Sequence, residues 1–219
     1  MDITDIKGAN VRKILDVLRF SSGMVKREIA SDTGLSFSTV SNVCNALEDL
    51  HILYETKSGD TTVGRTPDKF HFNSGGYCSL CVERPQEDIL RISALDFANK
   101  LLFQTELPLT ADDDAMSLSN YIQQVYEDLA HSQGFSGIEF VGVGLSVSGG
   151  QGHKNRQLTN GLHSNFDNTS LEELIRQRTG LPCYTESQAN LCVVSVSQAG
   201  HDSENILYLH SSTILSVGV

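Results

Sequence analysis

Hydrophobic positions between residues 25 and 53 recur at helical spacing in two short blocks. The first block, Val25–Asp32, predicts a short helix, and Gly34 can supply the positive φ that a tight turn between helices needs. We expect the second helix to begin after Ser36, because its hydroxyl can accept a hydrogen bond from an unpaired backbone N–H. The buried stripe of this second helix is Val40, Val43, Ala46, Leu47 and Leu50.

The opposite face of the second helix carries short hydrogen-bonding side chains that can approach base edges and phosphates. This pattern predicts a helix-turn-helix, whose recognition helix places its N-terminal residues against the bases of the major groove. The candidate DNA contacts on this helix are Ser36, Ser38, Thr39 and Asn42. Lys26, on the solvated side of the first helix, is a further candidate. The alternative is an ordinary pair of helices with a polar outer face.

Two strand-like segments after the second helix predict the winged variant of this motif. His51–Glu55 and Lys69–Phe72 are the expected strands, and a polar, glycine-containing stretch joins them as a hairpin. Arg65 lies in that stretch, where an arginine can contact phosphate or enter a minor groove. With an amphipathic helix over Asn10–Phe20, these segments predict a winged helix-turn-helix DNA-binding domain over residues 1–75.

Beyond the short linker Ser74–Gly76 the pattern becomes that of a mixed helix and sheet domain over residues 76–219. Three consecutive strands are expected to form an antiparallel meander, and a βαβ-like succession follows. The expected strands are 77–83, 89–95, 101–107, one that starts at 140 and runs into a glycine turn, 181–185, 206–210 and 214–219. The expected helices are 117–132, 171–179 and 188–199. The fold class is therefore α+β in the first domain and α/β in the second.

Composition fits a globular protein of one or two domains, with 219 residues, 39% hydrophobic and 20% charged. No apolar run is long enough to span a membrane, and the polar N-terminus is not a signal peptide, so we expect a cytoplasmic protein without a membrane partner. The net charge of −11 is unevenly divided. Residues 1–75 hold 9 basic and 10 acidic side chains, against 7 and 17 in residues 76–219. DNA binding would therefore depend on specific contacts or dimerisation.

The five cysteines are expected to be buried free thiols rather than metal ligands. Cys78 and Cys81 have the CxxC spacing, but in a strand residues three apart point to opposite faces. A second CxxC or a histidine pair, which would complete a zinc site, is missing from the sequence. We therefore expect no metal.

The order of elements and several motifs resemble the ROK family, which groups bacterial sugar-responsive repressors and sugar kinases. The resembling segments are Gly64–Pro67, Gly142–Gly149, Gly180–Pro182, Glu186–Asn190 and Leu207–Ser212, so the resemblance covers essentially the whole chain. It implies a winged helix-turn-helix before a lobe of an actin-like ATPase fold. It also implies a repressor of carbohydrate metabolism genes that binds a pseudo-palindromic double-stranded DNA operator as a homodimer or higher oligomer.

The chain departs from the kinases of that family at their phosphate and proton-transfer sites. Cys81–Glu87 stands in place of an Asp-x-Gly-x-Thr loop and has no glycines that would let backbone N–H groups cradle a phosphate. Ser187 and Gln188 replace an Asn-Asp pair, and an amide cannot act as a general base. The second phosphate loop, Ser211–Gly218, also lacks most of its glycines. We therefore expect no catalytic residue, cofactor or enzyme activity. The alternative is a sugar kinase or degenerate kinase with an appended helical domain.

The resemblance further implies that Asn160, Glu186, Ser187 and Gln188 face a sugar or sugar phosphate effector, whose binding would release the protein from DNA. The alternative is a pocket that has lost its ligand. The family's second lobe and zinc-binding cysteines would follow the second phosphate loop, whereas this chain ends at Val219, so we expect a C-terminally incomplete form with a truncated first lobe. A third possible function is that of a protein-interaction module or a non-functional fragment.

Overall fold

The computed structural model divides the chain into two compact units. It describes residues 8–19, 21–57, 60–61, 64–65, 68–86, 88–147, 150–151, 158–159, 171–198, 206–211 and 215–218. Unit 1 comprises Met1–Tyr77 together with Asp96–Lys100, and unit 2 comprises Cys78–Leu95 and Leu101–Val219. Each unit has its own cluster of buried apolar side chains. Within the described part of the chain, no helix is both long and apolar enough to cross a membrane.

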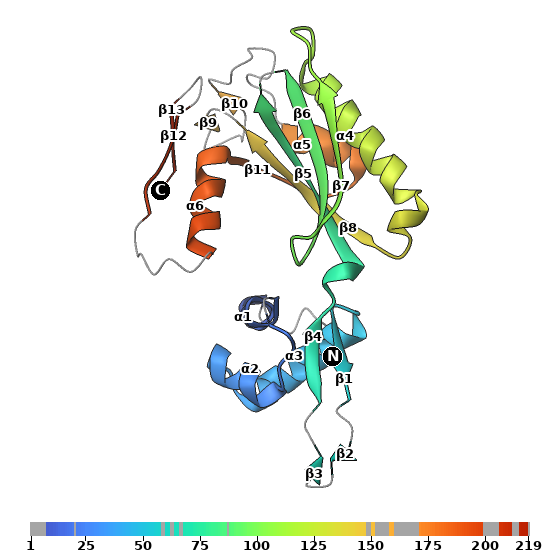
Figure 1. Cartoon of the computed structure of the whole chain (residues 1–219), viewed down its shortest axis with the longest axis vertical. Helices are drawn as coiled ribbons and strands as arrows, with labels where there is room; N and C mark the ends of the chain where they lie inside the picture. Colours follow the sequence, from blue (N-terminus) through green and yellow to red (C-terminus); the bar gives the residue numbers. More distant parts are fainter. Residues whose placement is uncertain are drawn as a thin grey trace. The chain divides into compact units, whose positions relative to one another are not determined.

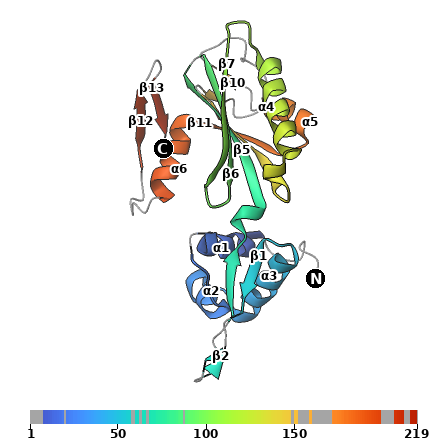
Figure 2. The same ribbon diagram turned by 45° about the vertical axis from the view of Figure 1, so that its right-hand side comes forward.

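Unit 1 is built on three helices, which Figure 2 shows packed around a common centre. They are α1 (Gly8–Arg19), α2 (Lys26–Thr33) and α3 (Phe37–Asp49). Their apolar sides meet the two strands that follow, because each helix is amphipathic and buries its stripe in one core. The fully or nearly fully buried side chains of this core are Ile14, Leu18, Ile29, Val40, Val43, Cys44, Leu47, Leu53 and Phe70.

Two glycines make the connections between these helices possible. Gly34 ends α2 in the left-handed region at φ 67°, where an L side chain is strained. Gly23, between α1 and α2, has φ 103°, and a Cβ there would collide with the ring of His71. The turn predicted at Gly34 is therefore confirmed, and Gly23 is required both by its backbone conformation and by its neighbour.

A small antiparallel sheet follows the helices of unit 1. Strands β1 (Leu53–Thr56) and β4 (Lys69–Phe72) pair with Leu53 opposite Phe72, and Met24 adds a bridge to Phe70 with N···O distances of 3.0 and 2.8 Å. Between β1 and β4 in the sequence, the short strands β2 (Asp60–Thr61) and β3 (Gly64–Arg65) pair with each other. The strands expected around residues 51–55 and 69–72 are thus present, with β1 beginning at Leu53 instead of His51.

The turn Asp96–Lys100 also belongs to unit 1. The guanidinium of Arg19 donates to the Phe97 carbonyl and to the Asn99 side chain, both at 2.9 Å. The Phe97 ring stacks on Phe72 and Tyr77, with centroids 5.6 and 5.7 Å away. The two hydrogen bonds join residues 78 and 80 positions apart, and neither they nor the ring contacts could be read from local sequence patterns.

Unit 2 contains a five-stranded sheet with the order β11-β8-β5-β6-β7, drawn in Figure 1. The strands are β5 (Tyr77–Gln86), β6 (Ile89–Asp96), β7 (Leu101–Pro108), β8 (Glu139–Val147) and β11 (Cys183–Ser187). Strands β6 and β7 are antiparallel, whereas β8 and β11 are parallel with Val143 opposite Cys183. The meander followed by a βαβ unit, expected from the sequence, is therefore present.

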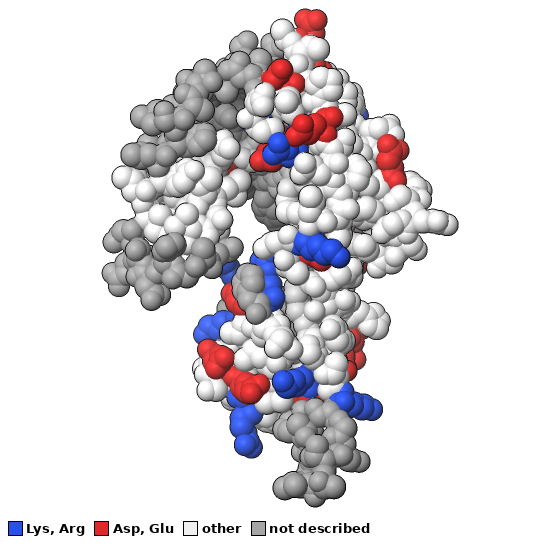
Figure 3. All heavy atoms as spheres, in the orientation of Figure 1, with Lys and Arg blue, Asp and Glu red and all other residues white. Residues whose placement is uncertain are grey.

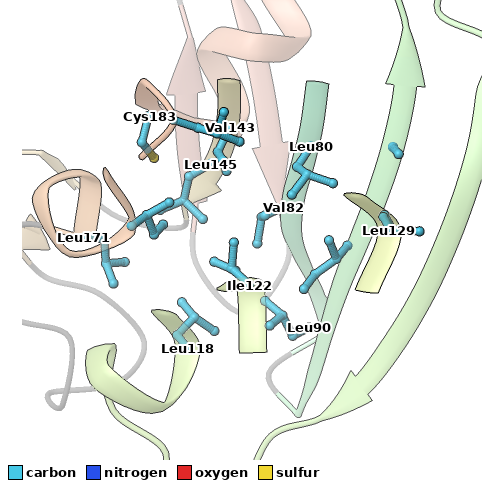
Figure 4. Packing of buried hydrophobic residues seen from close by; sticks show 14 of the residues in the cluster. Leu80, Val82, Leu90, Leu118, Ile122, Leu129, Val143, Leu145, Leu171 and Cys183 are labelled. Carbon is cyan, nitrogen blue, oxygen red and sulfur yellow. The ribbon is translucent and has the colours of Figure 1, made fainter. Parts of the chain in front are cut away.

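Helices α4 (Ala115–Ala130) and α5 (Leu171–Thr179) cover one face of this sheet (Figures 1 and 2). Alternate residues in the first part of β5, namely Cys78, Leu80 and Val82, are buried in the cluster that these helices share. Figure 4 shows Ile122 and Leu118 of α4 reaching toward Val82 and Leu90 of the sheet. This packed layer is the core of unit 2.

The remaining elements of unit 2 are one helix and two short strand pairs, which come after β8 or after β11 in the sequence. Helix α6 (Gln188–Gln198) begins directly after β11, and Figures 1 and 2 draw it on the other side of the sheet from α4 and α5. Two short antiparallel pairs join β9 (Gly150–Gln151) to β10 (Leu158–Thr159) and β12 (Tyr208–Ser211) to β13 (Leu215–Gly218). A short 3-10 turn lies at Gln133–Phe135 in unit 2, and another lies at Ser74–Gly76 in unit 1.

The core of unit 2 can be tested at Ile122, whose side chain is 0% exposed. We expect Ile122→Ala to lower the free energy of unfolding by about 2–5 kcal/mol, because it leaves a cavity beneath the sheet. Asn120→Ala, two residues away on the exposed side of α4, should change it by less than about 0.5 kcal/mol. Urea unfolding measures both, and equal midpoints for the two variants would contradict the assignment of this layer as the core.

Candidate nucleic-acid interface

The start of α3 is fixed by Ser36. Its backbone is extended, at φ −66° and ψ 148°, and its hydroxyl accepts a hydrogen bond from the Thr39 N–H at 3.1 Å. The same Oγ lies 2.9 Å from Ser38 Oγ and 2.8 Å from Thr39 Oγ1. Ser36 is thus the N-cap that the sequence predicts, and three of the four predicted α3 contacts form one hydroxyl cluster.

The fourth predicted contact, Asn42, lies one helical turn beyond Ser38. Both side chains are exposed, whereas Val40, Val43, Cys44 and Leu47 are buried on the other side of α3. The Asn42 amide makes no hydrogen bond to any described residue. It is therefore available to a partner, and an amide can pair with adenine through both its donor and its acceptor.

Lys26 is engaged within unit 1. Its ammonium donates to Asn45 Oδ1 at 2.8 Å and to Ser41 Oγ at 3.3 Å, and lies 4.8 Å from the centroid of the Phe70 ring. The group therefore joins α2 to α3 and to β4. A contact between Lys26 and DNA stays a prediction, and it would compete with these internal contacts.

Arg65 lies in β3, where its backbone pairs with Asp60. Its side chain lies outside the described residues, so its contact with DNA also stays a prediction. The pairing of Asp60 with Arg65 and of Thr61 with Gly64 places this arginine on an antiparallel hairpin. That location is the one expected from the sequence.

Phe37 is not among the DNA contacts predicted from the sequence. This first residue of α3 is 59% exposed and borders a hollow of about 620 Å³. The hollow is lined by Val25, Lys26, Arg27, Glu28, Ser31, Phe37, Glu55, Asp68 and Phe70. The position directly after the cap could have identified Phe37, because that end of a recognition helix lies closest to the bases.

Charges of both signs lie on the surface of unit 1. Figure 3 shows lysine and arginine side chains next to aspartate and glutamate on the visible face of this unit. A mixed surface attracts DNA weakly at physiological salt, because non-specific affinity depends on the number of phosphates neutralised. Specific contacts would therefore have to supply much of the binding energy.

In unit 2, two of the four residues predicted to face a sugar, Glu186 and Ser187, have structural partners. The Ser187 hydroxyl accepts from the Asn190 N–H at 3.2 Å, so it caps α6. Glu186 accepts from the Ser187 N–H and from the Asn190 side chain, both at 2.8 Å. Glu186, Ser187 and Gln188 lie together at the β11–α6 junction, whereas Asn160 lies outside the described residues.

The region that stands in place of a phosphate loop is a continuous strand. Strand β5 runs on to Gln86 instead of ending in a glycine turn. Arg91 on β6 binds Glu83 of β5 at 2.9 Å and Glu106 of β7 at 2.7 Å. The hydrogen bonds to Glu106 and Glu83 raise the pKa of Arg91. Strand β5, with the carboxylates of Glu83 and Glu106 beside it, offers no cradle of backbone N–H groups for phosphate.

All five cysteines are free thiols, as expected, with Cys44, Cys78 and Cys183 buried and Cys81 and Cys192 half-buried. Desolvation raises the pKa of the Cys44 thiol to about 11 and also raises the pKa of Cys81, so both are protonated at neutral pH. Among the described residues, no group of three histidine, cysteine or acidic side chains is placed to hold a metal ion.

The chain was compared with known proteins by sequence and by structure. No protein-family model matches the chain. Over its whole length it is similar to two proteins named Xylose repressor, with 24% identity in Bacillus spizizenii and 25% in Bacillus subtilis. The chain spans 58% of the length of each of these curated relatives.

Solved structures show the same relationship at the level of fold. A ROK family transcriptional regulator, described as a homolog of the E. coli MLC protein, matches 95% of this chain and 53% of its own, with a TM-score of 0.78 and 16% identity. The inorganic polyphosphate/ATP-glucomannokinase of Arthrobacter sp. strain KM matches 64% of this chain and 57% of its own, with a TM-score of 0.51 and 16% identity. The resemblance to the ROK family is therefore confirmed, and so is its mixed helix and sheet architecture of the actin-like ATPase type.

The cap at Ser36 can be tested by substitution. We expect Ser36→Ala to destabilise unit 1 by about 1 kcal/mol, because the Thr39 N–H loses its acceptor. Ser36→Asp is the matched control, since its carboxylate can accept the same hydrogen bond and is favourable at a helix N-terminus. Thermal unfolding followed by circular dichroism measures both, and an equal loss in the two variants would show that the hydroxyl is not the cap.

Proposed function

We propose that this chain is a sequence-specific DNA-binding transcriptional regulator of the ROK type, and a repressor of carbohydrate metabolism genes. The observation that carries the proposal is the start of α3, where a capped helix follows a left-handed turn and exposes Ser38 and Asn42. The β1–β4 hairpin directly after α3 supports the interpretation of unit 1 as a winged helix-turn-helix. Similarity over the whole chain to two xylose repressors supports the regulatory role.

In this proposal α3 is the recognition helix. The N-terminal part of α3 enters the major groove, so Ser36, Ser38, Thr39 and Asn42 approach base edges or phosphates. Arg65, on the β2–β3 hairpin, contacts phosphate or the adjacent minor groove. The domains of the proposal are the winged helix-turn-helix over residues 1–75 and the ROK-type lobe over residues 76–219.

Unit 2 is the effector or dimerisation part of the proposed regulator. A carbohydrate or its phosphate would bind at the β11–α6 junction, with Asn160 and Glu186–Gln188 as candidate contacts. A two-fold dimer would place two α3 helices on the half-sites of a pseudo-palindromic operator. The ligand would release DNA only if it bound more tightly to the conformation in which the two helices are misplaced.

A sugar kinase is the second candidate function, favoured by the fold shared with the glucomannokinase. Two features of this chain argue against kinase activity. Strand β5 continues through the region of the phosphate loop, and Gln188 stands where the general base would be. We therefore propose a non-enzymatic role. ATP-dependent phosphorylation of a hexose that is lost on substitution of Glu186 or Gln188 would overturn this part of the proposal.

The decisive experiment is selection of bound sites from random double-stranded DNA, followed by a search for sugars that release them. Recovery of one preferred sequence supports the proposal. Failure to retard any selected or genomic fragment, even at low salt, would overturn it and favour a protein-interaction module or a non-functional fragment. If the chain binds the selected sites only in the presence of another protein from the lysate, it does not recognise DNA on its own.

Asn42→Ala should change which operator bases are preferred. We expect a loss of about 1–3 kcal/mol at the position that Asn42 contacts, if the contact is bidentate. Asn120→Ala is the matched control, because the same side chain is removed from an exposed helix position in unit 2. Binding to a panel of single-base operator variants measures the effect, and an unchanged preference would remove Asn42 from the reading surface.

Arg65→Ala should instead weaken binding to all sequences by a similar factor. Loss of one phosphate contact lowers the slope of log affinity against log salt by about 1. Lys13→Ala serves as the control, since Lys13 is an exposed cation on α1. Titrations at several salt concentrations distinguish the two variants. A change of base preference without a change of slope would assign Arg65 to base reading.

A further inference from the structure

Phe37 stands apart among the exposed residues of unit 1. Its side chain is 59% exposed, more than the other large exposed hydrophobics of this unit, Tyr54 and Leu50, at 48% and 42%. Single exposed apolar side chains are ordinary on protein surfaces, so exposure alone assigns no role. What distinguishes Phe37 is its place as the first residue of the proposed recognition helix, directly after the cap.

The polar groups around Phe37 are largely engaged with one another. The Ser36 hydroxyl is bonded within its own cluster, and Ser41, one turn after Phe37, accepts from Lys26. Asn45 accepts from the same lysine. Within the described residues 37–42 at the start of α3, the exposed side chains without an internal hydrogen bond are therefore the amide of Asn42 and the ring of Phe37.

The hollow beside Phe37 indicates what kind of group can cover the ring. The residues that line it include the acidic Glu28, Glu55 and Asp68 and the basic Lys26 and Arg27. With three acidic groups and two basic ones, this concavity disfavours a phosphate. An uncharged, apolar group is the better partner for the ring.

In the major groove the apolar group on a base edge is the C5-methyl of thymine. We propose that Phe37 is a specificity-determining residue, whose ring packs on thymine methyl groups of the bound DNA. This inference rests on the proposed DNA-binding function and deepens it. It assigns to this chain a preference for thymine within each half-site, read by van der Waals contact and not by hydrogen bonds.

Replacing thymine by deoxyuridine tests the contact, because it removes the methyl group and keeps every hydrogen-bonding group. Sites are first selected from random DNA with the full chain, and each thymine of a half-site is then replaced in turn. We expect one or two replacements to weaken binding of the parent protein about fourfold each, the effect of exposing about one methyl group. Phe37→Ala should bind the thymine and deoxyuridine sites equally.

Phe37→Leu is the matched variant, since it keeps an apolar side chain and should retain part of the response to thymine. Thermal unfolding should show all three proteins folded, because Phe37 lies on the surface. If Phe37→Ala keeps the full difference between thymine and deoxyuridine, the inference is overturned and DNA binding stands. A parent protein that selects no DNA overturns both. Unchanged DNA binding with loss of self-association in Phe37→Ala would place the ring in a protein interface and also overturn the inference.

Discussion

The ammonium group of Lys26 joins the elements on which the proposed reading surface depends. It bonds Asn45 and Ser41 of α3 from a position on α2, and its charge lies over the Phe70 ring of β4. Helix α2 has only 8 residues, so its propensity cannot hold it in place and tertiary contacts must do so. Ile29 in the core and Lys26 at the edge provide these contacts. The contacts of Lys26 and Ile29 therefore fix the orientation in which α3 exposes Ser38 and Asn42.

In unit 2 the packing of the sheet against its helices does not depend on a glycine loop at the end of β5. The alternation that buries Cys78, Leu80 and Val82 in β5 needs only apolar side chains at every second position. A phosphate loop needs glycines at one end of that strand, and the core does not require them. In this chain the strand continues, and Glu83 at that end is neutralised by Arg91. Packing of the layer and binding of a phosphate are thus separable constraints.

Much of the local structure could be predicted from the sequence, because it depends on neighbouring residues. Ser36 caps α3 as expected, and α5 has the predicted bounds Leu171–Thr179. Two misses are the extension of β5 to Gln86 and the grouping of Asp96–Lys100 with unit 1, and the second depends on hydrogen bonds to the distant Arg19. The engagement of Lys26 belongs to the same class, because its partners lie 15 and 19 positions away.

For the candidate site, the sequence identified the polar side chains but not how they are already used. The predicted hydroxyls of Ser36, Ser38 and Thr39 bond to one another in the free protein. Turning one of them toward a base would exchange an internal hydrogen bond for one to DNA, so its net gain is small, on the order of 1 kcal/mol or less. A group without an internal partner gives up only its contacts with water. In the proposed complex with DNA, discrimination between bases would therefore fall chiefly to Asn42 and to the apolar contact of Phe37, while the hydroxyl cluster would hold the end of α3 in the shape that both residues require.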